Sequence, residues 1–196
     1  MIKMIMFDMD YTINNWSSKT YSRQISEESG ADFATVDRFT SKMIDSLDEG
    51  RLRLAQFERS ISKRFKVPRS RIKYCGCYER NVKVKSEMIR IIKRLKKRYL
   101  TALLTNSERC RYAYTAKIVD LKLFDYTFVS GYIRLLKPHP QIYRYVLKKT
   151  KLKSDEILFI DNNTQNVIGA RKVGIESIHF IGAKKLEEKL KRLGIW

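Results

Sequence analysis

The sequence lacks any apolar run that approaches the roughly 20 residues a membrane-spanning helix needs. Its first seven residues lack the small-residue cleavage site of a signal peptide and run directly into Asp8, so we interpret them as a strand. Internal repeats, low-complexity segments and long linkers are also missing. We therefore expect a cytoplasmic protein without membrane association, built as one domain or as one domain with a modest insertion.

Cysteine and histidine are scarce, with three and two copies in 196 residues. An odd cysteine count with one Cys-x-Cys pair, Cys75 and Cys77, argues against a disulfide framework. We predict that these two and Cys110 are ordinary thiols in a reducing compartment. The histidines, His139 and His179, do not complete a zinc site with them, and we expect both to be structural rather than catalytic.

Acidic residues are in the minority, because 41 basic residues against 21 acidic ones give a net charge of +20. The basic residues concentrate in residues 63–73, in residues 83–98 and close to the C-terminal end. A field of that sign attracts anions and is compatible with non-specific nucleic-acid binding. An ordinary solvated basic surface is the explanation that we favour, and the charge alone does not assign a partner.

Short, almost wholly apolar stretches recur along the chain, as is typical of strands buried on both faces of a parallel sheet. They are Lys3–Phe7, Leu100–Leu104, Tyr126–Val129, Ile157–Ile160 and Ser177–Ile181. Helix-like segments separate them at Ser86–Arg98, Pro140–Lys149 and Thr164–Val173, with Gly174 ending the last. The alternation predicts an α/β fold with a Rossmann-like, doubly wound parallel sheet.

The stretch from Trp16 to Tyr78 breaks this alternation, since it contains no convincing buried strand. Residues 34–47 and 52–65 instead carry apolar side chains at helical spacing, with Gly50 between them. We predict a small all-helical cap at residues 16–79, inserted after the first strand of a core formed by residues 1–15 and 80–196. The apolar stripes of this cap could form its own core or mediate dimerisation, so a monomer and a homodimer both remain open.

Asp8 follows the first apolar stretch, and Asp10 stands two residues further on. Two carboxylates at the edge of a sheet can take different roles in one reaction. One attacks phosphorus, and the other gives a proton to the leaving oxygen and later takes one from water. A lone Asp-x-Asp is a weak signal, but its position after an apolar strand and before Thr12 strengthens it.

The next apolar stretch ends in Thr105 and Asn106, and Lys137 precedes a Pro-His-Pro segment. A hydroxyl and backbone N–H groups at a strand end can bind a phosphate oxygen, although an ordinary helix cap explains the same residues. The prolines fix the backbone around Lys137, so its ammonium group is placed where a flexible surface lysine would not be. That ammonium group would offset the charge of a phosphate and of a nucleophile.

Asp161 ends a fourth apolar stretch and is followed by Asn162, Asn163 and Asn166. Carboxylate and amide oxygens at a sheet edge suit Mg²⁺, which prefers a few carboxylates together with water and phosphate. We predict that Asp161 and Asp8 hold this ion. A helix cap at Asn163 is the alternative explanation for part of the segment.

In this order and spacing, the four motifs closely resemble those of the haloacid dehalogenase superfamily, over the whole chain. The matching segments are residues 7–12, 103–106, 137–138 and 159–162 with 166–167 and 169–170. Residues 129–143 are similar to the subgroup with a helical cap between the first two motifs. The resemblance implies a Mg²⁺-dependent phosphatase with Asp8, Asp10, Thr105 and Lys137 as catalytic residues. It further implies metal ligation by Asp8, the backbone carbonyl of Asp10 and Asp161, phosphate contacts from Thr12 and Asn106, and support from Asn162 and Asn166.

Two positions depart from the family pattern, because Tyr11 stands where glycine is usual and Asn162 where a second aspartate is frequent. We expect hydrolysis of a small phosphorylated metabolite through an aspartyl-phosphate intermediate. The alternatives are phosphoryl transfer between sugar positions, a phosphatase of nucleotides or nucleic-acid ends, and a weak or inactive protein that binds nucleic acid. Asp10 favours a phosphatase over a dehalogenase, since the dehalogenases lack a matching aspartate.

Overall fold

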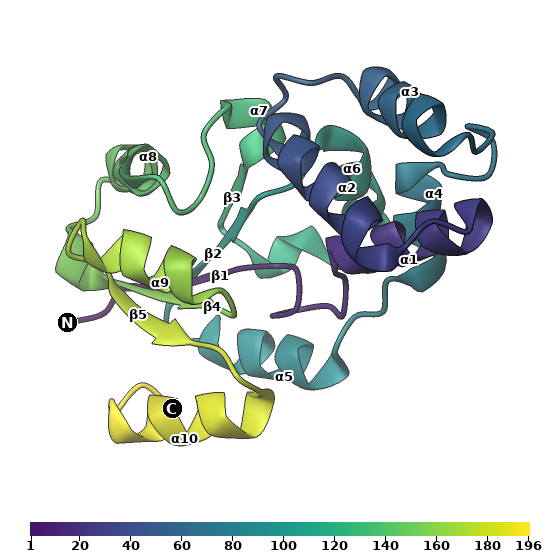
Figure 1. The fold of residues 1–196 in the computed structure, drawn as a ribbon. Coiled ribbons are helices and arrows are strands. Elements are labelled where there is room, and N and C mark those ends of the chain that lie inside the picture. Colours follow the sequence, from purple (N-terminus) through teal and green to yellow (C-terminus); the bar gives the residue numbers. More distant parts are fainter.

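A five-stranded parallel sheet forms the centre of the computed structural model, which describes residues 1–196 (Figure 1). Its strands are β1 (Met4–Phe7), β2 (Leu100–Thr105), β3 (Tyr126–Val129), β4 (Ile157–Asp161) and β5 (Glu176–His179), in the order β3-β2-β1-β4-β5. Each pair of neighbours is parallel. This order confirms the predicted α/β, Rossmann-like fold. The strands β1, β2 and β4 differ from their predicted ranges by one residue at one end, and β5 begins one residue earlier and ends two residues earlier than predicted.

Helices cover both faces of the sheet because successive strand residues point to opposite sides. Ile5 and Phe7 of β1 face a core that includes α5 (Ser86–Leu95) and α10 (Ala183–Arg192). Met4 and Met6 face a second core that includes α8 (Pro140–Thr150) and α9 (Thr164–Arg171). Figure 1 shows these helix pairs on opposite sides of the strands. Both faces are therefore buried, as the uninterrupted apolar strands require.

The remaining elements outside the first connection are α6, α7 and two short 3₁₀ turns. Their bounds are α6 (Arg109–Ile118), α7 (Ser130–Ile133), η1 (Leu121–Leu123) and η2 (Ser154–Glu156). The hydrophobic pattern did not predict α6, and its buried residues, Arg111 and Thr115, explain why. No helix of the molecule combines the length and apolarity needed to cross a membrane.

Four helices, which we call the helical insertion, lie between β1 and α5: α1 (Ser18–Ser29), α2 (Phe33–Asp48), α3 (Leu54–Phe65) and α4 (Tyr74–Asn81). The sequence predicted α2 and α3 but neither of the others. The buried side chains of α1 include a serine, and α4 is only eight residues long with a glycine inside it, so both have weak apolar stripes. The predicted boundary after residue 79 falls within α4. The division into two domains remains a prediction.

The apolar stripes of α2 and α3 pack within the chain. Val36 and Leu47 from α2 and Phe57 and Ile61 from α3 belong to one cluster of 13 buried residues drawn from the helical insertion and its flanking segments. Within this insertion, α1 packs on α2 and α4, while α4 also touches α6 and α2 touches α7. The apolar stripes that could have mediated dimerisation therefore form the core of the helical insertion itself.

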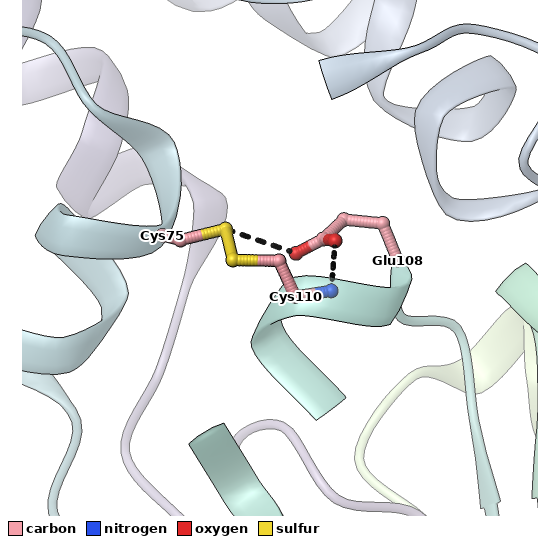
Figure 2. A group of neighbouring side chains, drawn as sticks. All are labelled: Cys75, Glu108 and Cys110. Atoms are coloured by element: carbon pink, nitrogen blue, oxygen red, sulfur yellow. Dashed lines mark hydrogen bonds between the residues drawn. A yellow bond between two sulfur atoms is a disulfide. The ribbon is translucent and has the colours of Figure 1, made fainter. Parts of the chain in front are cut away.

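The prediction that all three cysteines are free thiols is wrong for two of them. Cys75 of α4 and Cys110 of α6 form a disulfide, with their Cα atoms 6.2 Å apart (Figure 2). They lie 35 residues apart in sequence, and only the packing of α4 on α6 brings them together. Cys77 is a free thiol, as predicted, and its side chain is buried. The disulfide covalently joins the helical insertion to a helix that follows β2.

Candidate active site

Three of the predicted site residues lie at the carboxyl ends of neighbouring central strands. Asp8 directly follows β1, while Asp161 and Thr105 are the last residues of β4 and β2. The register pairs Phe7 of β1 with Ile160 of β4, which places the next residue of each strand side by side. The chain adds β2 and β3 on one side of β1 and then β4 and β5 on the other side, so the topological switch point lies between β1 and β4. Ligands of such sheets bind outside the carboxyl ends of the strands at this switch point.

Lys137 joins the two aspartates. Its Nζ lies 2.5 Å from Asp8 Oδ1 and 2.8 Å from Asp161 Oδ2. All three side chains are at least nine-tenths buried. Burial by itself would lower the pKa of Lys137, but the two carboxylates outweigh burial and raise it. The structure therefore brings together the positive charge and the two carboxylates that the sequence predicted to meet.

The pKa of the Asp8 carboxyl group is raised above its ordinary value. Burial and the nearby charge of Asp161 raise its pKa to about 7, although Lys137 opposes this shift. Two buried carboxylates share one ammonium group, so negative charge is in excess. A bound cation would remove that excess.

Asn106 holds Lys137 in place through a reciprocal pair of hydrogen bonds. Its Nδ2 donates to the carbonyl oxygen of Lys137 at 2.9 Å, and its Oδ1 accepts from the backbone N–H of Lys137 at 3.0 Å. Sequence reasoning assigned Asn106 to phosphate and missed this positioning role. The predicted phosphate contacts of Asn106 and Thr12, and the predicted catalytic role of the buried Thr105, stay predictions.

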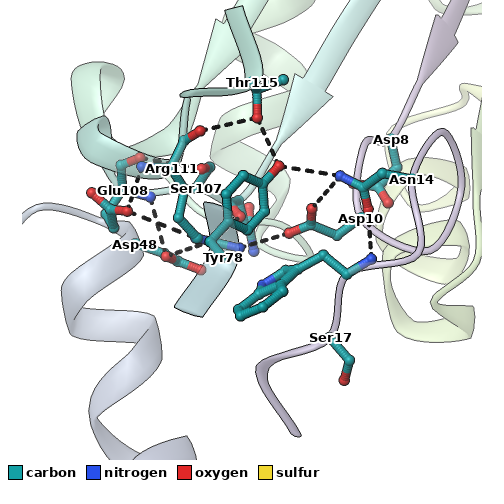
Figure 3. A network of polar contacts seen from close by, with 12 residues as sticks. Asp8, Asp10, Asn14, Ser17, Asp48, Tyr78, Ser107, Glu108, Arg111 and Thr115 are labelled. Atoms are coloured by element: carbon teal, nitrogen blue, oxygen red, sulfur yellow. Dashed lines mark hydrogen bonds and ion pairs between the residues drawn. The ribbon is translucent and has the colours of Figure 1, made fainter. Parts of the chain in front are cut away.

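Asp10 belongs to a second charged cluster, which the sequence did not reveal (Figure 3). Arg111 Nη1 lies 2.7 Å from Asp10 Oδ2, and Asn14 Nδ2 donates to the other oxygen at 3.0 Å. Arg111 Nη2 lies 2.9 Å from Asp48 Oδ1, and its Nε lies 3.8 Å from Glu108 Oε1. One guanidinium group is therefore surrounded by three carboxylates, which come from the loop after β1, the end of α2 and the residue that caps α6.

This cluster is largely buried, and it contains three carboxylates for one guanidinium group. Arg111 is 3% exposed, and neighbouring acidic groups hold its pKa well above the ordinary value despite burial. Burial raises the pKa of Asp48 to about 7; Arg111 opposes that shift, while Asp10 and Glu108 add to it. No sequence signal separated Arg111 from the other 40 basic residues, and Asp48 lies at the end of a helix whose apolar stripe alone was informative.

Oxygen atoms suited to a cation converge beside Asn162. With its amide oriented to satisfy both neighbours, the Asn162 nitrogen lies 3.2 Å from Asp8 Oδ2 and 2.9 Å from the Asp10 carbonyl oxygen. Asp161 is fixed nearby, since it accepts from the Asn163 N–H at 2.7 Å and from Asn166 Nδ2 at 2.9 Å. Two carboxylates and a carbonyl group at one edge of the sheet offer the oxygen ligands that Mg²⁺ prefers, so the residues present fit this ion.

Tyr11 occupies the left-handed region of the backbone, with φ of 61°, at the position where the family pattern has glycine. This conformation costs an L-residue with a side chain about 1–2 kcal/mol. Tyr11 is 51% exposed and lines the cavity, with Lys85 Nζ 5.9 Å from its ring centre. This departure from the family pattern therefore places a side chain where the backbone conformation favours glycine.

We expect Tyr11→Gly to be more stable than Tyr11→Ala by about 1 kcal/mol. Both variants lose the ring, so their difference isolates the left-handed backbone. Urea unfolding of the two proteins side by side measures it. Equal stability, or a more stable alanine variant, would contradict the assignment of strain to this residue.

A cavity of about 300 Å³ opens between the sheet edge and the helical insertion. Asp8, Asp10, Asn106, Lys137 and Arg111 line it from the core side. The residues that line it from the helical insertion and the segment leading into it are Trp16, Ser17, Ser18, Ile44, Asp48 and Tyr74. The candidate nucleophile and the candidate proton carrier thus face one common space.

His179, for which we predicted a structural role, contacts the backbone of the site at Asn162. Its Nε2 lies 2.8 Å from the carbonyl oxygen of Asn162. Glu108, besides its part in the charged cluster, caps α6. It accepts from the backbone N–H group of Cys110 at 2.5 Å (Figure 2) and from that of Arg111 at 2.6 Å. Both contacts fix backbone next to residues that line the cavity.

The sequence of this chain matches that of a known class of hydrolases. Residues 5–180 match the family model of haloacid dehalogenase-like hydrolases. The chain belongs to this family.

Similar proteins include both phosphatases and larger enzymes. Glyceraldehyde 3-phosphate phosphatase from Pyrococcus furiosus is 30% identical over 99 residues, which cover 48% of this chain and 40% of that protein. Drimenol cyclase drtB from Aspergillus calidoustus is 35% identical over 74 residues, 38% of this chain and 14% of the cyclase. The matches therefore span less than half of either relative.

Solved structures share the fold at low sequence identity. A haloacid dehalogenase-family enzyme from Bacteroides thetaiotaomicron, in complex with magnesium and inorganic phosphate, superposes with a TM-score of 0.76 at 18% identity. The superposition covers 91% of this chain and 93% of that one. A family member from Porphyromonas gingivalis gives 0.76 at 21% identity, with 98% of both chains covered.

Proposed function

We propose that this protein is a Mg²⁺-dependent phosphatase that hydrolyses a small phosphomonoester through an aspartyl-phosphate intermediate on Asp8. The observation that carries the proposal is the Asp8 carboxylate, which lies at the sheet edge beside the cavity and is held with Asp161 on the Lys137 ammonium group. A nucleophile, a fixed positive charge and a second carboxylate within one ion-paired group suit attack on a phosphoryl group.

In the first step, an Asp8 carboxylate oxygen forms a bond to phosphorus while the bond from phosphorus to the ester oxygen breaks. Asp10 gives a proton to that leaving oxygen. In the second step, Asp10 takes a proton from water, whose oxygen attacks phosphorus and restores the Asp8 carboxylate. The ion pair with Arg111 at 2.7 Å holds the Asp10 carboxyl group in place at the cavity that Asp8 also lines.

Lys137 neutralises part of the charge that gathers on Asp8 and the phosphoryl oxygens. Asp8, the Asp10 carbonyl group and Asp161 are the residues that would hold Mg²⁺, and the bound ion would supply further neutralisation of phosphoryl charge. The magnesium and phosphate bound by the structurally similar Bacteroides enzyme support the choice of cofactor. The similarity to the Pyrococcus phosphatase supports the reaction class.

The charges at the cavity favour this function over nucleic-acid binding at the same place. Its lining includes the carboxylates of Asp8, Asp10 and Asp48, while its two cations, Lys137 and Arg111, are already paired with carboxylates. A groove for a polyanion needs free positive charge. We therefore assign a small phosphorylated metabolite to the cavity.

The experiment is hydrolysis of p-nitrophenyl phosphate by metal-free protein, with and without added Mg²⁺. We expect turnover to rise at least tenfold on adding Mg²⁺, because the oxygens assigned to the ion carry an excess of negative charge without it. EDTA should reverse the effect, and a second addition of Mg²⁺ should restore it. Equal turnover in EDTA and in Mg²⁺, or none in either, would contradict the proposal.

A further inference from the structure

Two of the three basic segments of the sequence come together in the folded chain. Residues 86–98 carry six basic residues and one acidic residue, and residues 183–196 carry five and two. The helices of these segments, α5 and α10, contact each other and contribute to one core cluster. Figure 1 shows them on one side of the sheet, away from α2 and α3 of the helical insertion. This face of the molecule therefore gathers positive charge that the proposed active site does not use.

One face of α5 and of the turn after it carries a row of cations, which we call the basic stripe. Its members recur at helical spacing and are all exposed: Arg90, Lys93, Arg94 and Lys97. Like charges three and four residues apart destabilise a helix, and the helix dipole favours only those cations that lie in the last turn. Lys96 is paired with Asp125, whereas no member of the basic stripe forms an ion pair. The stripe therefore presents the free positive charge that a polyanion needs.

The basic stripe ends at a groove with aromatic side chains in its lining. The groove has a volume of about 390 Å³, and its lining includes Arg94, Lys97, Arg98, Tyr99 and Trp196. The Arg94 guanidinium group lies over the Trp196 ring, 4.2 Å from its centre. That of Arg98 lies 5.5 Å from the centre of the Tyr99 ring. The other two lining residues are apolar, so three cations and two aromatic rings share one groove without a carboxylate side chain.

The groove lies at the edge of the sheet opposite to the proposed active site. Tyr99 directly precedes β2, so it stands where the strands begin, whereas Asp8 and Asp161 stand where strands end. Tyr99 and Trp196 pack against a core cluster of 19 buried residues and still stay partly exposed. A ligand in the groove would therefore contact both rings without competing with the substrate.

We propose that this face binds single-stranded nucleic acid, with phosphates on the basic stripe and a base against the rings of Trp196 and Tyr99. From Arg90 to Lys97 the stripe extends over about 10 Å, since a helix rises about 1.5 Å per residue, and several phosphates of one strand fit this length. Charge alone assigned no partner, whereas aromatic rings beside free cations are typical of surfaces that bind single strands. Stacking needs an unpaired base, which a single strand offers. The proposal is independent of the role of Asp8.

The first test measures binding of a labelled oligothymidylate of about 15 nucleotides by fluorescence anisotropy over a range of salt concentrations. Each phosphate contact adds about −0.7 to the slope of log K against log salt concentration, so four cations should give about −3. The variant Lys93→Gln/Arg94→Gln/Lys97→Gln should bring the slope to about −1. Its Tm should stay close to that of the parent, because glutamine suits a helix and repulsion along the stripe is removed.

The matched control removes the same charge from the opposite side of the sheet. Arg144→Gln/Lys148→Gln/Lys149→Gln changes three exposed cations of α8. This variant should keep an affinity within about twofold of the parent and an unchanged slope, since its cations lie far from the groove. An equal loss in both triple variants would show that the net charge of +20 alone attracts the strand, and it would overturn the proposal.

A second variant tests the aromatic part of the groove. Trp196→Leu keeps an apolar side chain but loses the ring, so binding should weaken about tenfold while the salt slope stays unchanged. The oligothymidylate should quench tryptophan fluorescence in the parent and not in this variant, because the other tryptophan, Trp16, is only 2% exposed. Unchanged affinity of Trp196→Leu would overturn the proposal. So would inorganic polyphosphate or phosphatidylserine vesicles that bind as tightly as the oligothymidylate.

Discussion

Asp8→Asn is expected to lower kcat for p-nitrophenyl phosphate by at least about 10⁴-fold, because an amide cannot form the covalent intermediate. The same substitution should not destabilise the fold. The folded-state pKa of Asp8 is raised from 3.8 to about 7, so the folded protein binds more protons than the unfolded chain between these values. Its charge therefore lowers stability as pH rises through this window, and a neutral amide removes that cost.

Two measurements separate lost chemistry from lost structure. Steady-state kinetics in Mg²⁺ gives the fall in kcat, and thermal unfolding in metal-free buffer at pH 7.5 should give a Tm equal to or above that of the parent. Asp155→Asn is the control, since Asp155 is exposed in η2, which leads into the opposite end of β4, and it should change neither quantity. An active Asp8→Asn protein would contradict the assignment of Asp8 as nucleophile.

The part of the site that sequence predicted is the part that strands position. Asp8 and Asp161 each stand where an apolar run gives way to polar residues, and the ends of parallel strands share one edge of a sheet. Local pattern and this general geometry together were sufficient to place them near each other. Lys137 was found because prolines follow it, a signal that also lies within a few residues.

The part that sequence missed depends on packing between distant elements. Arg111 is a single basic residue among many, and its meaning comes from Asp48 of α2 and Asp10 of the β1 loop, which approach it only in the folded chain. The Cys75–Cys110 disulfide has the same origin, because it records the contact of α4 with α6. Neither relationship leaves a spacing or a period in the chain that would distinguish it from chance.

Asn106 illustrates an intermediate case. Its position after β2 correctly marked it as part of the site, but both ends of its amide group bind the Lys137 backbone. An asparagine can donate and accept, so its sequence position does not determine its partner. The structure adds the partner and thereby a reason for the placement of Lys137.

Lys137→Met is expected to reduce the free energy of unfolding by about 3–5 kcal/mol, because removal of one partner leaves buried charges without compensation. Two carboxylates, those of Asp8 and Asp161, lose their shared cation, while methionine keeps a similar unbranched shape. Urea unfolding in metal-free buffer at pH 7.5 measures the loss. Lys148→Met on the exposed face of α8 is the control and should stay within about 0.5 kcal/mol of the parent.

The double variant Asp8→Asn/Lys137→Met identifies the origin of that loss. If the cost of Lys137→Met comes from repulsion between two unpaired carboxylates, making one of them neutral removes part of it. The double variant should then be more stable than Lys137→Met alone, by about 1 kcal/mol or more. A double variant that is no more stable than Lys137→Met would instead trace the loss to packing around the lysine stem, and the ammonium group would no longer be what holds the nucleophile beside Asp161.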